Sequence, residues 1–175
     1  MPNGDVPPLE YARAFQQLHA GMREVKLAAP HFTQRVREAL EIVEDNGRSP
    51  ALLQPDREFL GELLRSTAAS IQRTEAPEQL LHGEPHPGNL LNTRNGPRFI
   101  DLETCCRGPV EFDVASAPGE VADHYRGLSQ GLLDECRTLT VALVAAWRWD
   151  RHDQFPDGRA MGEELLAQLR GRTHR

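Results

Sequence analysis

Six side chains that could bind a metal ion or transfer a proton lie within one short stretch of the sequence, residues 80–103. The stretch reads LLHGEPHPGNLLNTRNGPRFIDLE, and the six are His82, Glu84, His86, Asn89, Asp101 and Glu103. Carboxylate and amide oxygens suit Mg²⁺, which usually keeps coordination positions open for substrate phosphates and water. A second carboxylate nearby could accept a proton from an attacking hydroxyl. These residue types therefore favour a metal-assisted group transfer, if the fold brings them together.

The second half of this stretch is expected to form a β-hairpin. Asn95-Gly96 is a strong signal for a two-residue hairpin turn. With that turn, Leu90 faces Asp101 and Asn89 faces Leu102 across the strands. Asn89 and Asp101 then lie beside each other at the open end of the hairpin, roughly 5 to 8 Å apart by standard sheet spacing.

Glu84 precedes Asn89 across the segment PHPG, whose prolines and glycine favour a compact loop over a strand. Such a loop can fold the Glu84 carboxylate back toward the open end of the hairpin. The three groups together would provide what phosphoryl transfer needs, since a metal ion neutralises phosphate charge and a base orients the nucleophile.

Helices are expected to surround this polar cluster. Apolar residues recur at helical spacing over residues 8–25, 32–43 and 55–73, and again over 112–125, 128–149 and 159–170. Pro118-Gly119 is expected to break the fourth of these helices. The hairpin is then the only β element, and the predicted fold class is α+β and mostly helical.

Length and composition narrow the class of protein. A chain of 175 residues fits one domain. Its longest apolar run, TVALVAAW at 140–147, is too short to cross a membrane, and no signal peptide is visible, so we expect a soluble cytoplasmic protein. The net charge of −6 argues against nucleic acid as a partner. Three cysteines form neither a disulfide framework nor a paired zinc motif.

The motif HGEPHPGN followed by FIDLE resembles the catalytic loop and metal-binding segment of the aminoglycoside phosphotransferase and choline kinase-like family. That family has HGDxxxxN, a hairpin, and then IDxE or IDxD, and the downstream RGPVEFDVAS is similar to its GDPxxDLA segment. The resemblance covers residues 80–116. It implies a protein-kinase-like fold, ATP as co-substrate and Mg²⁺ as cofactor.

The resemblance also implies a role for each matching residue. It makes Glu84 the catalytic base, Asn89 and Asp101 the Mg²⁺ ligands, Glu103 a metal ligand or local structural residue, and His82 and Asp113 supports of the loop. The family usually has Asp where this chain has Glu84, whose carboxylate lies about 1.5 Å farther from the backbone, a displacement that can cost a hundredfold in rate.

A kinase of this fold holds its nucleotide between two lobes, with a glycine-rich loop and a lysine on the N-terminal lobe. The sequence contains no GxGxxG, and its one lysine, Lys26, lies at the end of an expected helix. Residues 1–175 are therefore interpreted as a single domain, the C-terminal catalytic lobe, without the N-terminal nucleotide-binding lobe. The lobe face left uncovered is expected to be apolar and to favour association.

The favoured function is ATP γ-phosphoryl transfer to a hydroxyl of an aminoglycoside-like or amino-alcohol substrate. The alternatives are a non-catalytic kinase-like remnant that acts as a binding domain, and a metal-dependent hydrolase built on the same acids.

Zinc binding by His82 and His86 needs a helix that the surrounding glycines and prolines prevent. The alternative for Asn89 and Asp101 is that they have no chemical role and are the polar ends of a hairpin that face water. Asp113 reads as a helix N-cap.

Overall fold

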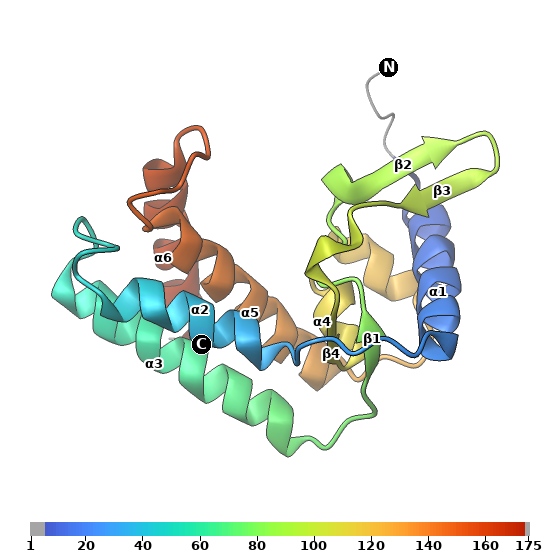
Figure 1. Cartoon of the computed structure of the whole chain (residues 1–175), viewed down its shortest axis with the longest axis horizontal. Coiled ribbons are helices and arrows are strands. Elements are labelled where there is room, and N and C mark those ends of the chain that lie inside the picture. Colours follow the sequence, from blue (N-terminus) through green and yellow to red (C-terminus); the bar gives the residue numbers. More distant parts are fainter. Residues whose placement is uncertain (1–5, 174–175) are drawn as a thin grey trace. The chain divides into compact units, whose positions relative to one another are not determined.

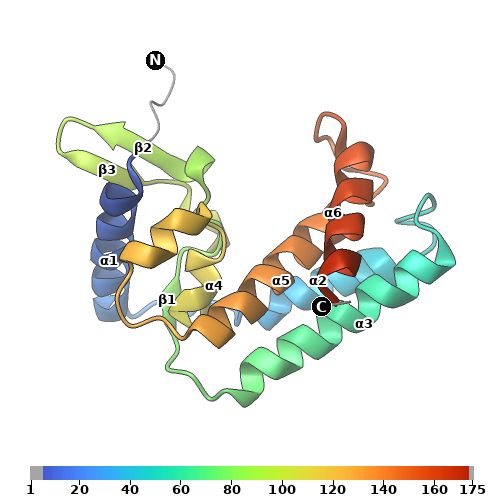
Figure 2. The ribbon, with the colours of Figure 1, turned by 180° about the vertical axis from the view of Figure 1, so that it is seen from behind.

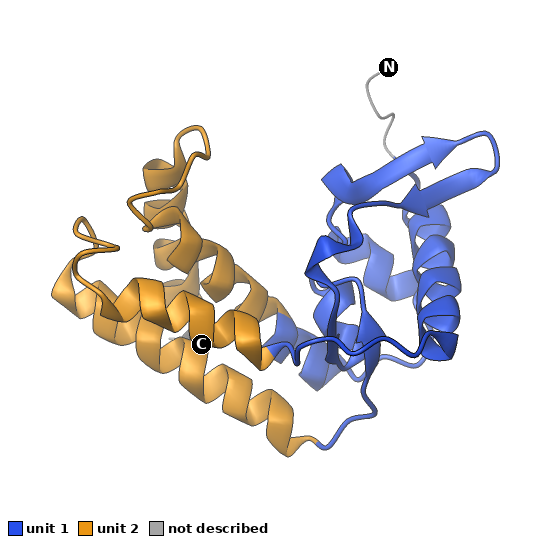
Figure 3. Cartoon of the chain, in the orientation of Figure 1, with its two compact units in different colours: residues 1–32, 75–136 blue, residues 33–74, 137–175 orange. Residues whose placement is uncertain are grey.

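The computed structural model describes residues 6–173, and these fall into two compact units (Figure 3). Unit 1 comprises the described residues up to 32 together with 75–136, and unit 2 comprises 33–74 together with those from 137 onward. The prediction of a mostly helical α+β fold is confirmed.

The helices and strands follow in chain order. Unit 1 contains α1 (Pro8–Glu24), β1 (Gln79–Leu81), η1 (Pro87–Asn89), β2 (Leu90–Thr93), β3 (Gly96–Phe99), η2 (Leu102–Thr104), β4 (Cys106–Gly108), α4 (Val110–Val114) and η3 (Gly119–His124). Unit 2 contains α2 (Thr33–Glu44), α3 (Gln54–Arg73) and α6 (Gly158–Thr173), and the division between the units falls inside α5 (Gln130–Arg148).

Helix α1 forms one wall of unit 1 (Figure 1). It begins after Pro7 with Pro8 in its first turn, where proline lacks only an N–H that would have had no partner in the helix. Its buried face includes Tyr11 and Phe15, which share a core with Leu90. The helix contacts β1, β3 and η3, so it lies against both sheets of the unit.

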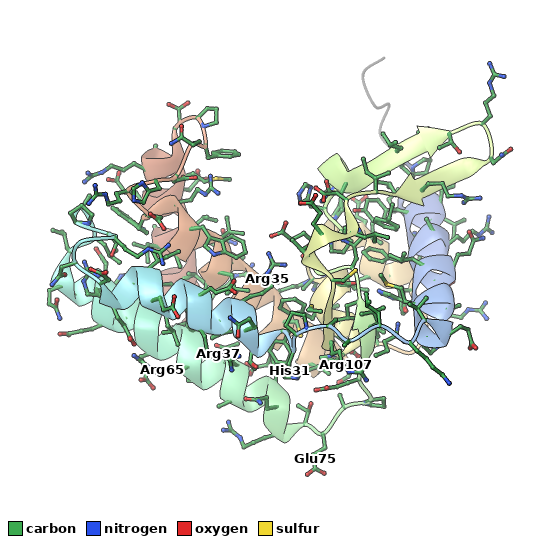
Figure 4. The ribbon with its side chains drawn as sticks, viewed as in Figure 1. His31, Arg35, Arg37, Arg65, Glu75 and Arg107 are labelled. Atoms are coloured by element: carbon green, nitrogen blue, oxygen red, sulfur yellow. The ribbon has the colours of Figure 1, made fainter. Side chains whose placement is uncertain are left out.

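Unit 1 contains two small antiparallel sheets, and the prediction of a single β element is wrong. Strands β2 and β3 form the expected hairpin, while β1 pairs with β4. Strand β4 is also bordered by the chain entering α2, because Arg107 N–H donates to the Pro30 carbonyl and Phe32 N–H donates to the Arg107 carbonyl (2.8 and 2.9 Å). His31 and Arg107 lie side by side at this edge (Figure 4).

The hairpin register differs from the predicted one by two residues. Its turn is Arg94-Asn95, and Leu90 pairs with Phe99, not with Asp101. A turn centred on Asn95-Gly96 would need positive φ at both residues. Only Gly96 has it, with φ of 87°. The Thr93 hydroxyl stabilises the observed turn, since it donates to the Gly96 carbonyl and accepts from Asn95 N–H (2.7 and 3.2 Å).

The helices of unit 2 lie side by side in both views of the chain (Figure 2). They bury apolar side chains, among them Val36 and Val43 of α2 and Leu60 of α3. Arg170 joins α6 to α3, because its guanidinium lies 2.7 Å from the Asp56 carboxylate and over the ring of Phe59. No described helix is long and apolar enough to cross a membrane.

One helix boundary differs from the prediction in a way that affects the site. Helix α4 begins at Val110, directly after Pro109. The expected N-cap, Asp113, is therefore inside the helix as its fourth residue, and its carboxylate does not cap the helix.

Candidate active site

His82 joins the loop of residues 82–89 to the end of the hairpin. Its side chain is fully buried, and Nε2 lies 2.8 Å from the carbonyl oxygen of Ile100. Its Nδ1 lies 3.4 Å from the backbone N–H of Glu84. A carbonyl can only accept and an N–H can only donate, so Nε2 is the donor of this ring and Nδ1 the acceptor. One side chain thereby ties both candidate metal-binding segments together.

The buried carboxylate of Asp113 holds the start of the same loop. It accepts hydrogen bonds from the backbone N–H groups of His82 and Gly83, both at 2.8 Å, and from His19 Nε2 at 3.0 Å. Its exposed fraction is 0%. A buried carboxylate is tolerated only when it is paired in this way. This geometry fits a bracing role for Asp113 and not that of a metal ligand.

Gly83 is required where the loop passes the segment after the hairpin. Its φ is +94°, and a Cβ built on it would lie 2.0 Å from the Thr104 carbonyl oxygen. The Thr104 hydroxyl donates to the His82 carbonyl at 3.2 Å. Segments 82–84 and 102–104 are therefore in direct backbone contact, which a larger residue would break.

The side-chain amide of Asn89 has a fixed orientation. Its Nδ2 donates to the Glu84 carbonyl at 2.9 Å. Its Oδ1 is therefore turned to a different side, as a cation ligand must be. The backbone of Asn89 is held as well, because its N–H donates to the His86 carbonyl and its carbonyl accepts from Ile100 N–H (2.9 and 3.0 Å).

Asp101 directly follows Ile100, the residue hydrogen-bonded to both Asn89 and His82. Its side chain is exposed, and its backbone is left-handed, with φ of 63° and ψ of 68°. Strained backbone in a non-glycine residue persists only where neighbouring structure enforces it, and it is common at functional sites. The backbones of Asn89 and Asp101 therefore lie at the same end of the hairpin, although the register there is not the predicted one.

Glu84, the candidate base, is half-buried in a backbone that is held on several sides. Its carbonyl accepts from Asn89 Nδ2 and from His86 N–H, each at 2.9 Å. The next residue is held by α1, since the Tyr11 hydroxyl donates to the Pro85 carbonyl at 2.6 Å. Burial, aided by the negative charge of Asp113, raises the pKa of Tyr11, so the hydroxyl keeps its proton and remains a donor.

The other candidate residues are more peripheral. Glu103 is exposed in η2, and His86 is exposed with its Nδ1 accepting from Gly88 N–H at 3.1 Å. Among residues 6–173, no three His, Cys, Asp or Glu side chains are grouped as a metal site.

Three residues that hold this site, directly or through a neighbour, were missed as site residues by the sequence reasoning: Tyr11, His19 and Tyr125. Tyr11 and His19 lie on the buried face of α1 and flank Phe15, with ring centroids 5.4 and 5.3 Å from that ring. A histidine on an apolar helix face was the available signal, because a buried polar side chain needs a partner.

The fold is shared with kinases of small molecules. A family model described as "Phosphotransferase enzyme family" (APH) matches residues 3–155, and the chain belongs to this family. The resemblance seen in the sequence is thereby confirmed.

Curated relatives are kinases of greater length. The chain is 31% identical over 130 residues to methylthioribose kinase of Pectobacterium carotovorum subsp. carotovorum (strain PC1), a match that covers 66% of this chain and 32% of that protein. The chain thus spans about a third of the length of this relative.

Solved structures share the fold at low sequence identity. A choline/ethanolamine kinase family protein from Mesorhizobium loti aligns with a TM-score of 0.75 and 15% identity, over 94% of this chain and 61% of that one. An amicoumacin kinase in complex with AMP-PNP, Ca²⁺ and Ami aligns with a TM-score of 0.70 and 13% identity, over 99% and 63%.

Proposed function

We propose that this chain provides the catalytic lobe of an ATP- and Mg²⁺-dependent kinase that phosphorylates a hydroxyl of a small molecule. One observation carries the proposal: the hydrogen bonds of Ile100 bring Asn89 and Asp101 to the same end of the hairpin, beside the loop that contains Glu84. Family membership supplies the reaction class.

The donor set suits a divalent cation with oxygen ligands. Asn89 offers an amide oxygen whose direction is fixed by the Glu84 carbonyl, and Asp101 offers an exposed carboxylate. Mg²⁺ usually binds through one or two protein oxygens plus phosphates and water, and bound there it would neutralise phosphate charge. Asn89 and Asp101 are therefore proposed as its ligands, with Glu103 as a further ligand or a structural residue.

Glu84 is proposed as the base that orients the acceptor hydroxyl and takes its proton. A base must be held in place relative to the metal site. Asn89 meets this need, because its amide binds the Glu84 carbonyl and the same side chain is a proposed metal ligand. His82 and Asp113 are proposed as supports that keep this loop in one conformation.

The proposed acceptor is an aminoglycoside-like or amino-alcohol compound. The names of the structural relatives support this class, since they include choline/ethanolamine kinase and amicoumacin kinase. The net charge of −6 agrees with a cationic acceptor, although charge alone does not locate its pocket. Nucleic acid is not proposed as a partner.

The exposed apolar residues near the metal-binding end of the hairpin support a proposal of association through this face. Leu91, Ile100 and Leu102 are 42, 39 and 50% exposed. Apolar side chains gathered beside a polar site are typical of a surface that another part of a protein, or a second chain, covers.

Metal binding provides the direct test. Mn²⁺ added to the isotope-labelled chain should first broaden the backbone NMR signals of residues 84–89 and 100–103. Asp101→Asn should reduce this effect at least about tenfold, because a neutral amide replaces the charged ligand. Asp123→Asn, an exposed change in η3, is the matched control and should leave the effect intact. Equal broadening in wild type and Asp101→Asn would refute the site.

A further inference from the structure

A chain of hydrogen bonds leads away from the buried Asp113 to two side chains to which the proposed chemistry assigns no role. His19 Nε2 lies 3.0 Å from Asp113 Oδ2, and His19 Nδ1 lies 2.8 Å from the Tyr125 hydroxyl. His19 is 1% exposed. Tyr125, His19 and Asp113 thus form a continuous path that ends at the backbone N–H groups of the loop before Glu84.

One arrangement of the protons uses every hydrogen bond in this path. The Asp113 carboxylate accepts two backbone N–H bonds, so His19 Nε2 must donate to it as the third. Burial raises the pKa of Tyr125 to about 12; Arg23 opposes this rise, and Asp113 and Glu111 add to it. The tyrosine keeps its proton and can donate to His19 Nδ1. Each donor in the path then points toward the carboxylate.

We propose that His19 and Tyr125 are positioning residues that act through Asp113 to hold the loop of residues 82–84. Asp113 Oδ2 is shared between His19 Nε2 and His82 N–H, so His19 fixes the rotation of the carboxylate. With that rotation fixed, Oδ1 meets Gly83 N–H and the chain enters Glu84 in one direction. The catalytic meaning of this positioning rests on the proposed function.

Helix α1 holds the loop at two points, which supports the positioning role proposed for His19. Tyr11 binds the Pro85 carbonyl on one side of Glu84, and His19 acts on the other side through Asp113. Phe15 lies between the two rings and keeps them on one face of the helix. A helix without proposed catalytic residues therefore sets the position of the loop on both sides of the proposed base.

Conservative variants separate this role from packing. His19→Phe keeps a ring against Phe15 but removes both hydrogen bonds. His19→Gln restores an N–H donor at about the position of Nε2. Tyr125→Phe removes a single oxygen atom. His124→Gln changes an exposed histidine of η3 that lies beside Tyr125 and serves as the matched control.

The readout is hydrogen exchange of the His82 and Gly83 backbone amides, followed by NMR on residues 1–175. Rates are compared with those of Leu60 and Leu64 amides in α3, which report the stability of unit 2. His19→Phe should raise exchange at His82 and Gly83 at least about tenfold, since a hydrogen bond to a charged group is lost. Tyr125→Phe should raise it severalfold, and His19→Gln should exchange more slowly than His19→Phe. The control should match wild type.

Unchanged exchange at both amides in a folded His19→Phe chain would overturn the proposal, and so would a His19→Gln chain that behaves like His19→Phe. If His19→Phe does not fold, Tyr125→Phe decides: wild-type exchange overturns the proposal. The measurement needs no catalytic activity. Failure of the phosphotransferase proposal, seen as full turnover in Glu84→Gln, is therefore distinguishable from failure of this one.

Discussion

Glu84 has a well-held backbone and a side chain one methylene longer than the aspartate usual in its family. The Asn89 amide and the His86 N–H both bind its carbonyl, so the extra length is not compensated by a looser main chain. The loop also lies against the segment that follows the hairpin, with Gly83 next to the Thr104 carbonyl. The position of the carboxylate is thus determined by a few contacts that can each be tested.

Glu84→Gln should lower turnover at least about a hundredfold with little change in nucleotide affinity, because a general base contributes 10²–10⁴. The measurement uses a fusion of residues 1–175 to the nucleotide-binding lobe of a related kinase. Asp123→Asn, an exposed change in η3, is the matched control and should retain full activity, since Asp123 has no proposed role in the reaction. Undiminished turnover in Glu84→Gln would show that the base is another group.

Gly83→Ala should lower the free energy of unfolding by about 2 to 4 kcal/mol, because alanine is strained at φ of +94° and its Cβ would meet the Thr104 carbonyl. Urea denaturation measures the change. Gly21→Ala in α1 is the control: its Cβ meets no atom within 4 Å, and it should stabilise the helix by about 0.5 to 1 kcal/mol. A neutral Gly83→Ala would contradict the described backbone contact.

At the scale of helices and strands, the elements that depend on local sequence were predicted correctly. The elements that depend on pairing between distant segments were not. Helices α1, α2 and α3 begin and end within two residues of the predicted bounds, because apolar periodicity and flanking prolines are local signals. Strand β4 is three residues long and pairs with β1, so nothing in its own sequence indicated it. The hairpin was predicted with the wrong turn because Asn95-Gly96 fits two turn types.

The candidate site shows the same division. The resemblance located Glu84, Asn89 and Asp101, and the structure places them in neighbouring segments. The contacts of His19 with Asp113 and with Tyr125 join three separate parts of the chain and could not be predicted from spacing. They became visible only when the packing of α1 against η3 was known.

In unit 2, Arg57 is an element-scale feature that can be tested. It is 7% exposed and donates to the carbonyls of Val43, Ser49 and Leu52 and to the Ser49 hydroxyl, so it caps α2 and holds the following loop. Its removal leaves several buried acceptors without partners.

Arg57→Met should therefore lower the free energy of unfolding by about 2 to 4 kcal/mol. Arg65→Met on the same helix is the control, because Arg65 is exposed and pairs with Glu44 at the surface, where an ion pair contributes about 0 to 1 kcal/mol. Urea denaturation followed by circular dichroism compares the two variants. Equal effects would show that the buried hydrogen bonds of Arg57 add nothing.

At the scale of the whole molecule, the chain covers 61 to 63% of the two structural relatives described above and about a third of the methylthioribose kinase. Its sequence has no GxGxxG, and Lys26 is its one lysine. The proposed metal ligands and base are therefore present without the groups that usually clamp the phosphates in this fold.

Residues 1–175 alone should bind ATP no more tightly than millimolar and show negligible phosphotransferase activity. Each missing charged contact would contribute about 1.5 to 3 kcal/mol, and about 1.4 kcal/mol is a factor of ten in affinity. Titration calorimetry and a coupled assay with the purified chain check both values. Robust turnover that Asp101→Asn abolishes would refute this prediction.

The orientation of the Asn89 amide explains why this position carries an amide and not a second acid. One end of the group donates to the Glu84 carbonyl while the other end remains an acceptor. A carboxylate of the same size and shape would place two acceptors face to face. A charged aspartate, although a stronger ligand for a cation on its own, would therefore repel the backbone carbonyl of the base. At this position, a side chain with a donor at one end and an acceptor at the other fits the site better than a charged side chain with two acceptors.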